Sequence, residues 1–177
     1  LDNAAKKDSV GICFVGEKNL KDFLGRFIDL KKGEIIDEFG NRIGQHDGAT
    51  LYTKGQRQGL KIGGVKGRED LPWYVFDKDI NKNEVYVCQG LENKLLFSNG
   101  LIVNKMSLIN NLKLQYPKRC MLQVRHQHTP VECIIKKRGN AFHIVFAKKI
   151  RGVSPGQSAV FYEKNICLGG GIITETF

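Results

Sequence analysis

The chain has 177 residues, of which 41% are hydrophobic and 26% are charged. This balance is typical of one ordinary globular domain or of two small ones. No apolar run approaches the roughly 20 residues that a membrane-spanning helix needs, and no signal peptide is visible in the sequence.

The net charge of +10 is concentrated in the second half of the chain. Residues 1–90 hold 15 Lys and Arg against 14 Asp and Glu, whereas residues 91–177 hold 13 against 4. Two interpretations fit this imbalance. The basic half is either a surface that keeps the protein soluble or a domain that binds a polyanion such as a nucleic acid.

The five cysteines form no C-x-x-C pair, which argues against a zinc site. They stand at positions 13, 88, 120, 133 and 167. Lone thiols in a lysine-rich chain suit a reducing compartment, so we expect a cytoplasmic protein. Cys88, Cys120 and Cys133 fall on strand patterns and are expected in the core.

Cys13 lies in the segment Asp8-Ser9-Val10-Gly11-Ile12-Cys13-Phe14-Val15-Gly16, with lysines close on both sides. The flanking glycines let the backbone turn or rearrange. Nearby ammonium groups favour the thiolate, which is the form that attacks or carries sulfur. These residues alone still favour a buried, inert cysteine, because free cysteine is among the most buried residue types.

The first half is expected to combine one helix with short strands. Apolar side chains at helical spacing predict a helix that Asn19 caps and Gly33 ends (Leu20, Phe23, Leu24, Phe27 and Ile28). A hairpin is expected over residues 34–44, and two further strands over 73–76 and 84–88. His46 is expected in a loop rather than as a metal ligand.

Residues 54–68 combine cations and glycines without any acid. The cations are Lys54, Arg57, Lys61, Lys66 and Arg68, with five glycines among them. Glycines let a backbone approach phosphate closely, and the cations supply charge. The spacing is not that of a Walker loop. A solvated loop is the alternative interpretation.

From about residue 95 the pattern is entirely β. Six apolar runs separated by turn signals predict a small barrel of about six strands (99–103, 119–124, 131–135, 141–146, 158–162 and 166–173). Within the last run, Gly169, Gly170 and Gly171 indicate a place where backbones pass closely. We expect a central domain over residues 1–92 and the barrel over residues 93–177. The overall class is mainly β with a small α+β region.

Arg125-His126-Gln127-His128 could suggest a metal site. Histidines two apart on a strand point to the same face, but no third ligand lies nearby in the sequence. A surface strand is the simplest interpretation of this motif, and RNA contact is favoured over metal binding.

Five blocks of the sequence resemble the tRNA-uridine 2-sulfurtransferases, the MnmA/TrmU family. The blocks are Lys6-Lys7-Asp8-Ser9-Val10-Gly11-Ile12-Cys13-Phe14-Val15-Gly16, Gly55-Gln56-Arg57-Gln58-Gly59-Leu60-Lys61-Ile62-Gly63-Gly64, Pro72-Trp73-Tyr74-Val75, Pro155-Gly156-Gln157-Ser158-Ala159-Val160-Phe161-Tyr162 and Cys167-Leu168-Gly169-Gly170-Gly171-Ile172-Ile173. They match the second half of such an enzyme. The family's amino-terminal ATP-pyrophosphatase domain is absent, and the chain begins with Leu1, so we expect a fragment or a processed product.

The resemblance implies a function for the whole enzyme. ATP with Mg, bound by the absent domain, adenylates the C2 oxygen of the wobble uridine, and a cysteine persulfide then supplies the sulfur of 2-thiouridine. Cys13 matches the sulfur-carrying position, and a second family cysteine in the absent domain can form a disulfide with it. No cofactor is expected on this fragment, which we expect to be inactive alone. The implied partners are tRNA and a sulfur-donor protein, either a sulfur relay protein or a cysteine desulfurase.

The resemblance also implies RNA contacts. The family places an Arg-Tyr pair at Arg125 and His126, where His126 departs from the pattern, and a tRNA-contacting glutamine at Gln157. The segment with Lys54, Arg57 and Lys61 is expected along tRNA or at the mouth of the active site. The family's last domain is a barrel resembling the second domain of elongation factor Tu.

Two other classes of protein remain as alternatives. A stand-alone RNA-binding module without catalysis accounts for the basic half equally well. A thiol redox protein would need a resolving cysteine near Cys13, and the sequence offers none close by.

Overall fold

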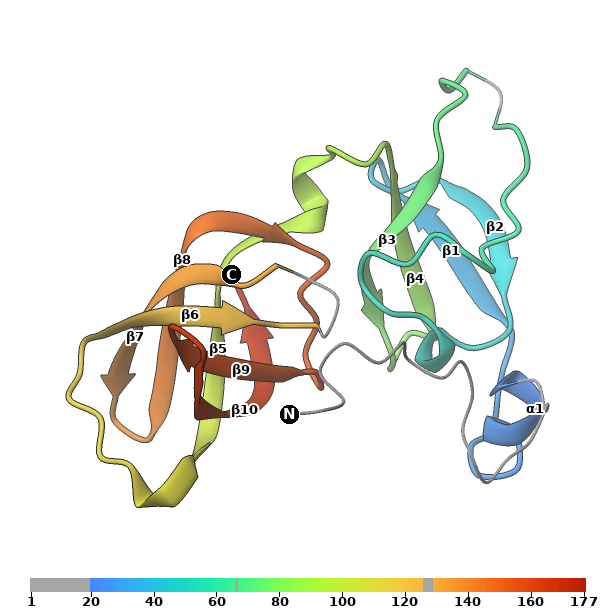
Figure 1. The fold of residues 1–177 in the computed structure, drawn as a ribbon. Coiled ribbons are helices and arrows are strands. Elements are labelled where there is room, and N and C mark those ends of the chain that lie inside the picture. The colour runs from blue at the N-terminus through green and yellow to red at the C-terminus, as the bar shows by residue number, and fades with distance from the viewer. Residues whose placement is uncertain (1–19, 66, 126–128) are drawn as a thin grey trace.

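A computed structural model describes residues 20–65, 67–125 and 129–177 of the chain. It is mainly β and consists of two bodies of sheet joined by a short connection (Figure 1). The first is a four-stranded sheet in the order β2-β1-β4-β3, and the second is a closed barrel in the order β10-β5-β8-β7-β6-β9. The predicted fold class and the six-stranded barrel are confirmed.

Two hairpins build the four-stranded sheet, as the sequence predicted. Its strands are β1 (Gly33–Asp37), β2 (Arg42–His46), β3 (Trp73–Asp79) and β4 (Glu84–Gln89). β1 pairs antiparallel with β2, and β3 with β4, whereas β1 runs parallel to β4 and so joins the hairpins. The centre of this sheet is fully buried at Ile35, Val75, Val85 and Val87.

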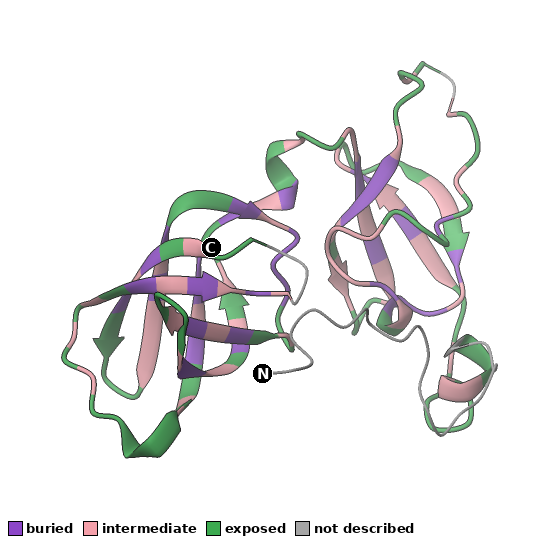
Figure 2. Ribbon diagram, viewed as in Figure 1, coloured by how far each residue is buried: buried purple, intermediate pink, exposed green. Residues whose placement is uncertain are grey.

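Each barrel strand coincides with one of the six predicted apolar runs, and only the run over 119–124 extends one residue beyond its strand. The strands are β5 (Phe97–Leu108), β6 (Lys118–Gln123), β7 (Val131–Arg138), β8 (Ala141–Arg151), β9 (Ser158–Glu163) and β10 (Ile166–Thr176). Successive side chains of a strand point to opposite faces, so alternate apolar residues fill the interior. Figure 2 shows the buried positions recurring along the strands, and the largest are Leu101, Leu122, Ile135, Ile144, Phe161 and Ile173.

The glycines of β10 lie where neighbouring backbones leave no room for a side chain. A Cβ on Gly170 would lie 2.5 Å from the carbonyl oxygen of Ala159 on β9. A Cβ on Gly171 would lie 2.4 Å from the carbonyl oxygen of Lys105 on β5. The expectation that these glycines are structural is confirmed.

The predicted helix is wrong beyond its first turn, because α1 spans only Leu20–Leu24. Gly25 follows at once, and glycine is a poor helix former. The amide of Phe27 then donates to the carbonyl of Leu24 at 2.9 Å in a turn. Phe27 is 72% exposed, so tertiary packing does not sustain the apolar stripe.

The other helical elements among the described residues are three short 3-10 turns. They are η1 (Ala49–Leu51), η2 (Lys94–Leu96) and η3 (Ile109–Asn111), of which η2 lies in the connection between the sheet and the barrel. None of the helices in the described residues is both long enough and apolar enough to cross a membrane.

His46 is a buried histidine at the end of β2 rather than a loop residue. Its Nδ1 accepts a hydrogen bond from the amide of Gly48 at 3.0 Å, and its ring meets that of Tyr52 edge-on. Its Nε2 is buried and has no partner among the described residues. Burial lowers the pKa of His46 below its usual 6.5, against the opposing effect of Asp47 and nearby backbone.

This lowered pKa predicts a loss of stability in mild acid. As the pH falls below about 6.5, the unfolded state binds the proton first, so the free energy of unfolding declines until the pH passes the lower pKa of the folded state. His46→Gln keeps an acceptor for the Gly48 amide but does not titrate. Denaturant unfolding at about pH 7.5 and about pH 5 should show a larger loss for the wild type than for His46→Gln. Equal losses would contradict the assignment.

Candidate nucleic-acid interface

The cation-bearing segment of residues 54–68 begins with a firm attachment to the edge strand β3. The amide of Gly55 donates to the carbonyl of Val75 at 2.7 Å, and the amide of Val75 donates to the carbonyl of Gln56 at 2.9 Å. The Gln56 side chain also accepts from the amide of Thr53 at 3.0 Å. The start of the segment is therefore held in one conformation.

The end of the same segment is attached to the β1–β2 turn. Arg68 forms a salt bridge with the buried carboxylate of Asp37, and its guanidinium lies 4.1 Å from the ring centroid of Phe39. Burial alone would raise the pKa of Asp37, but hydrogen bonds from Asn41, Arg68 and the Phe39 amide lower it. Asp37 is thus ionised at neutral pH and binds Arg68 as a carboxylate.

Arg125 connects this segment to the barrel. It follows β6, and its Nη2 donates to the carbonyl of Lys54 at 3.0 Å and to the carbonyl of Gly152 at 2.8 Å. Gly55 and Gly152 allow the backbones to meet here, since a Cβ on Gly55 would lie 3.2 Å from the Cα of Gly152. One half-buried guanidinium therefore bridges the sheet and the barrel.

The junction carries positive charge that no direct salt bridge within the described residues neutralises. Neither Arg125 nor Lys54 forms a salt bridge within that part of the chain. Burial, and then the nearby Arg151, lower the pKa of Arg125; burial also lowers the pKa of Lys54, although Asp77 opposes this. Both shifts express the cost of holding a cation partly out of water, which a bound anion would relieve.

A hollow of about 500 Å³ opens beside this junction and receives side chains from both halves of the chain. Four of the residues singled out in the sequence line it together: Lys54, Arg57, Arg125 and Gln157. The Oε1 atom of Gln157 and the Nε atom of Arg125 are buried without a partner among the described residues. The hollow thus presents three cations, and a hydrogen-bond acceptor and a donor that the described residues leave unused are buried in the side chains that line it.

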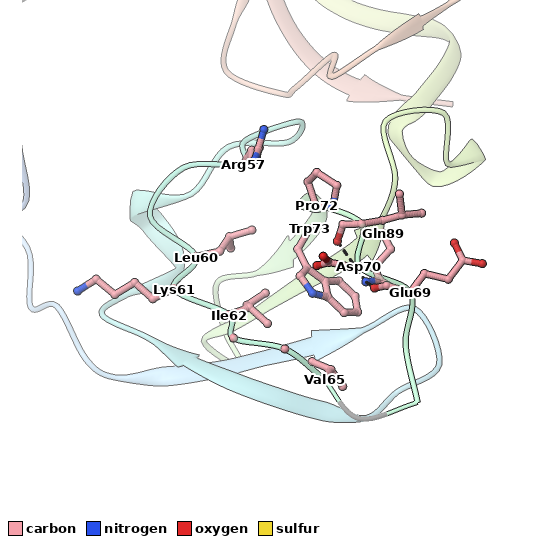
Figure 3. A pocket seen from close by; sticks show the side chains of 13 residues that line it. Arg57, Leu60, Lys61, Ile62, Val65, Glu69, Asp70, Pro72, Trp73 and Gln89 are labelled. Carbon is pink, nitrogen blue, oxygen red and sulfur yellow. Dashed lines mark hydrogen bonds between the residues drawn. The ribbon is translucent and has the colours of Figure 1, made fainter.

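Two further hollows adjoin this one through shared residues. Arg125 and Gln157 also line a hollow of about 500 Å³ over the barrel, which reaches Tyr162. Arg57 also lines a pocket of about 440 Å³ beside the sheet, together with Lys61 (Figure 3). All the predicted RNA-binding residues that the structure describes therefore line either the junction hollow or the pocket beside the sheet, which share Arg57.

Other predicted positions lie outside this assembly. Cys13 and His126 lie outside the described residues, as does the possible metal motif around His128. Within the part of the chain that the structure describes, no three His, Cys, Asp or Glu side chains could hold a metal ion.

Thr53, Gln56 and Gln58 also line the junction hollow, although none of them was predicted as a site residue. Gln56 and Gln58 flank Arg57 in the sequence, and this run of two amides around a cation could have identified them as site residues.

Two family models match consecutive parts of the chain. One, the "tRNA methyl transferase PRC-barrel domain", matches residues 21–89, and the other, the "Aminomethyltransferase beta-barrel domain", matches residues 98–173. Together they cover the four-stranded sheet and most of the barrel.

Curated relatives match nearly the whole chain. A tRNA-specific 2-thiouridylase MnmA of Legionella pneumophila is 47% identical over 97% of this chain and 48% of its own length. The protein of the same name from Buchnera aphidicola is 48% identical over 98% of this chain and 47% of its own length. The one from Pseudomonas aeruginosa is 43% identical over 98% of this chain and 46% of its own length. The chain belongs to the family of the tRNA-specific 2-thiouridylases, and it spans about half the length of the relatives it matches.

The bridging position of Arg125 predicts a structural cost when it is removed. A hydrogen bond that involves a charged group contributes about 1.5–3 kcal/mol, and the two bonds here share one partly exposed side chain. Arg125→Leu should lower the free energy of unfolding by about 2 kcal/mol. Arg119→Leu removes an exposed arginine of β6 that makes no such bonds and should change it little. Equal effects in chemical denaturation would show that the bridge contributes nothing.

Proposed function

We propose that this chain is the tRNA-holding and sulfur-carrying part of a cytoplasmic tRNA 2-thiouridine synthase, a sulfurtransferase. The observation that supports it best is the junction hollow, where Lys54 and Arg57 from one half meet Arg125 and Gln157 from the other. Three cations around an uncharged amide suit an RNA backbone, which is recognised through phosphate contact and shape. Under this proposal residues 93–177 are the tRNA-binding barrel and residues 1–92 the domain of the sulfur chemistry.

The chemistry is assigned to Cys13. Its thiolate accepts a sulfur atom from a donor protein, either a sulfur relay protein or a cysteine desulfurase, and carries it as a persulfide. The outer sulfur of the persulfide attacks C2 of the wobble uridine, and the oxygen leaves with the AMP of the activated uridine. In the same scheme a second family cysteine attacks the inner sulfur, so the S–S bond breaks, the outer sulfur stays on the uridine, and the two cysteines form a disulfide that an external thiol must reduce.

The uridine oxygen must be activated before sulfur can replace it. In the proposed scheme ATP with Mg supplies that activation by adenylation, and we assign its binding to the part of the relatives that this chain does not span. The described residues offer no three-ligand metal cluster, so no activation step is assigned to them. Their proposed role is to bind the tRNA and hold it in place.

Arg57 gives the clearest test of the RNA-binding surface, because its exposed side chain makes no salt bridge or hydrogen bond with the described residues. Arg57→Gln should weaken the binding of unmodified tRNA and lower the slope of log affinity against log salt by about 0.7–0.9. Gln157→Ala should weaken binding without changing the slope. Filter binding across several salt concentrations measures both quantities.

Lys82→Gln is the matched control for Arg57→Gln, because it removes one exposed cation from the β3–β4 turn. It should leave affinity and slope close to those of the wild type. If Arg57→Gln and Gln157→Ala both behave like this control, the junction hollow is not where tRNA binds.

The described cysteines support Cys13 as the reactive thiol by their own burial. Cys88, Cys120 and Cys133 are buried, and burial raises the pKa of Cys88 to about 12. The hydrogen bond between Cys120 and Cys133 lowers the pKa of Cys120, but its sulfur lies in the barrel core. Brief alkylation at neutral pH followed by peptide mapping should therefore label Cys13 first, with half-exposed Cys167 next.

The same assignment predicts a persulfide. After incubation with a cysteine desulfurase and cysteine, the Cys13 peptide should gain one sulfur atom by mass spectrometry, and Cys13→Ser should gain none. Sulfur found first on the Cys167 peptide would overturn the assignment.

A further inference from the structure

The pocket beside the sheet has two walls of different character around an apolar floor (Figure 3). Leu60, Ile62, Val65 and Trp73, which belong to or pack against the core of the sheet, form the floor. Arg57 and Lys61 belong to one wall, and Glu69 and Asp70 stand on the opposite side. Its volume of about 440 Å³ lies in the range of small-ligand pockets.

The four charged side chains at the rim make no direct polar contact with the described residues. Within the described residues none of them forms a salt bridge or a side-chain hydrogen bond. Arg68, in contrast, is fully engaged with Asp37 close by. The pocket therefore presents two cations at one end, of which Lys61 is also attracted by the charge of Asp47, and two carboxylates at the other.

Neither the backbone conformation nor the packing of the described residues requires glycine at Gly63 or Gly64 in the wall. Neither has a positive φ, and a Cβ on either would meet nothing within 4 Å. None of the backbone amides of residues 57–65 donates a hydrogen bond to another described residue. A bare backbone with free N–H groups beside two cations is suited to the close approach of a phosphate.

We infer that this pocket takes one unpaired nucleotide of the bound RNA, a site separate from that of the modified uridine. Its phosphate contacts Arg57, Lys61 and the free amides near Gly63, and its base lies on the apolar floor. Asp70 accepts hydrogen bonds from the Watson–Crick edge of the base. The inference rests on the proposed function, because Arg57 lines both this pocket and the junction hollow and so connects them.

The carboxylates determine which base fits best. An ionised carboxylate only accepts hydrogen bonds, so it requires donors on the base. Guanine presents two adjacent donors on that edge, whereas uracil presents one donor between two carbonyl oxygens, which a carboxylate repels. Bases in single-stranded RNA are recognised on these edges. The pocket should therefore prefer guanine and discriminate against uracil.

The chain contains a single tryptophan, and it lies in this pocket, so its fluorescence reports occupancy directly. GMP and UMP are titrated as probes, with inorganic phosphate as a third titrant. GMP should change the Trp73 emission saturably, with UMP and phosphate binding at least about tenfold more weakly, which is the usual scale of a two-bond base contact. Lys61→Gln should raise the Kd for GMP severalfold. Asp70→Asn should reduce the preference for GMP over UMP to about threefold or less.

Lys82→Gln and Glu175→Gln are the matched charge controls and should bind GMP like the wild type. Arg125→Leu should weaken tRNA binding yet leave the GMP titration unchanged, which separates this pocket from the junction hollow. The inference is overturned if no nucleotide alters the Trp73 emission, or if Asp70→Asn keeps the full preference for GMP. In both cases tRNA binding that still depends on Arg57 and Gln157 would leave the proposed function intact.

Discussion

Arg125 ties the two halves of the chain together at the junction, because it donates to a backbone carbonyl on each side. Backbone carbonyls are fixed points, unlike the ends of long side chains, so the guanidinium fixes the sheet relative to the barrel together with the apolar cluster of Tyr74, Cys88 and Leu96. The same geometry leaves Nε without a partner and faces the group toward the hollow shared with Gln157. The Nη2 atom of Arg125 therefore has its hydrogen-bond partners within the chain, whereas its Nε atom has none among the described residues.

The segment over residues 54–68 shows the same division between held and free groups. Its ends are fixed by Gly55 and Gln56 on β3 and by Arg68 on Asp37. Its middle carries Arg57 and Lys61, whose charged groups have no salt-bridge partner in the described residues. Fixing the ends reduces the conformational entropy that a ligand must pay to order the middle, and this favours binding by a preorganised surface.

The strands were predictable because alternation and turn signals are local properties of the sequence. The parallel pairing of β1 with β4 was not, because it joins segments about fifty residues apart and depends on the common core around Ile35 and Val85. The helix was overestimated because its apolar stripe was periodic, whereas Gly25 ended it and Phe27 stayed 72% exposed, in contact with the ring of its neighbour Phe23. For the site, the residue types were recognisable, but only tertiary structure shows that Lys54 and Arg125 meet across 71 positions of sequence.

The hydrogen bonds between Val75 and the segment at Gly55 and Gln56 have a consequence beyond the positioning of cations. β3 lies at the border of the open sheet, and such a strand offers unpaired backbone groups to any other chain that can add a strand. The N–H and the C=O of Val75 both form hydrogen bonds with residues 55 and 56, which therefore cover that edge of the sheet. The barrel has no border at all, since its strands close on themselves. The segment proposed to hold RNA thus also protects the sheet from edge-to-edge aggregation, so substitutions that loosen it should reduce the yield of soluble protein as well as the affinity for RNA.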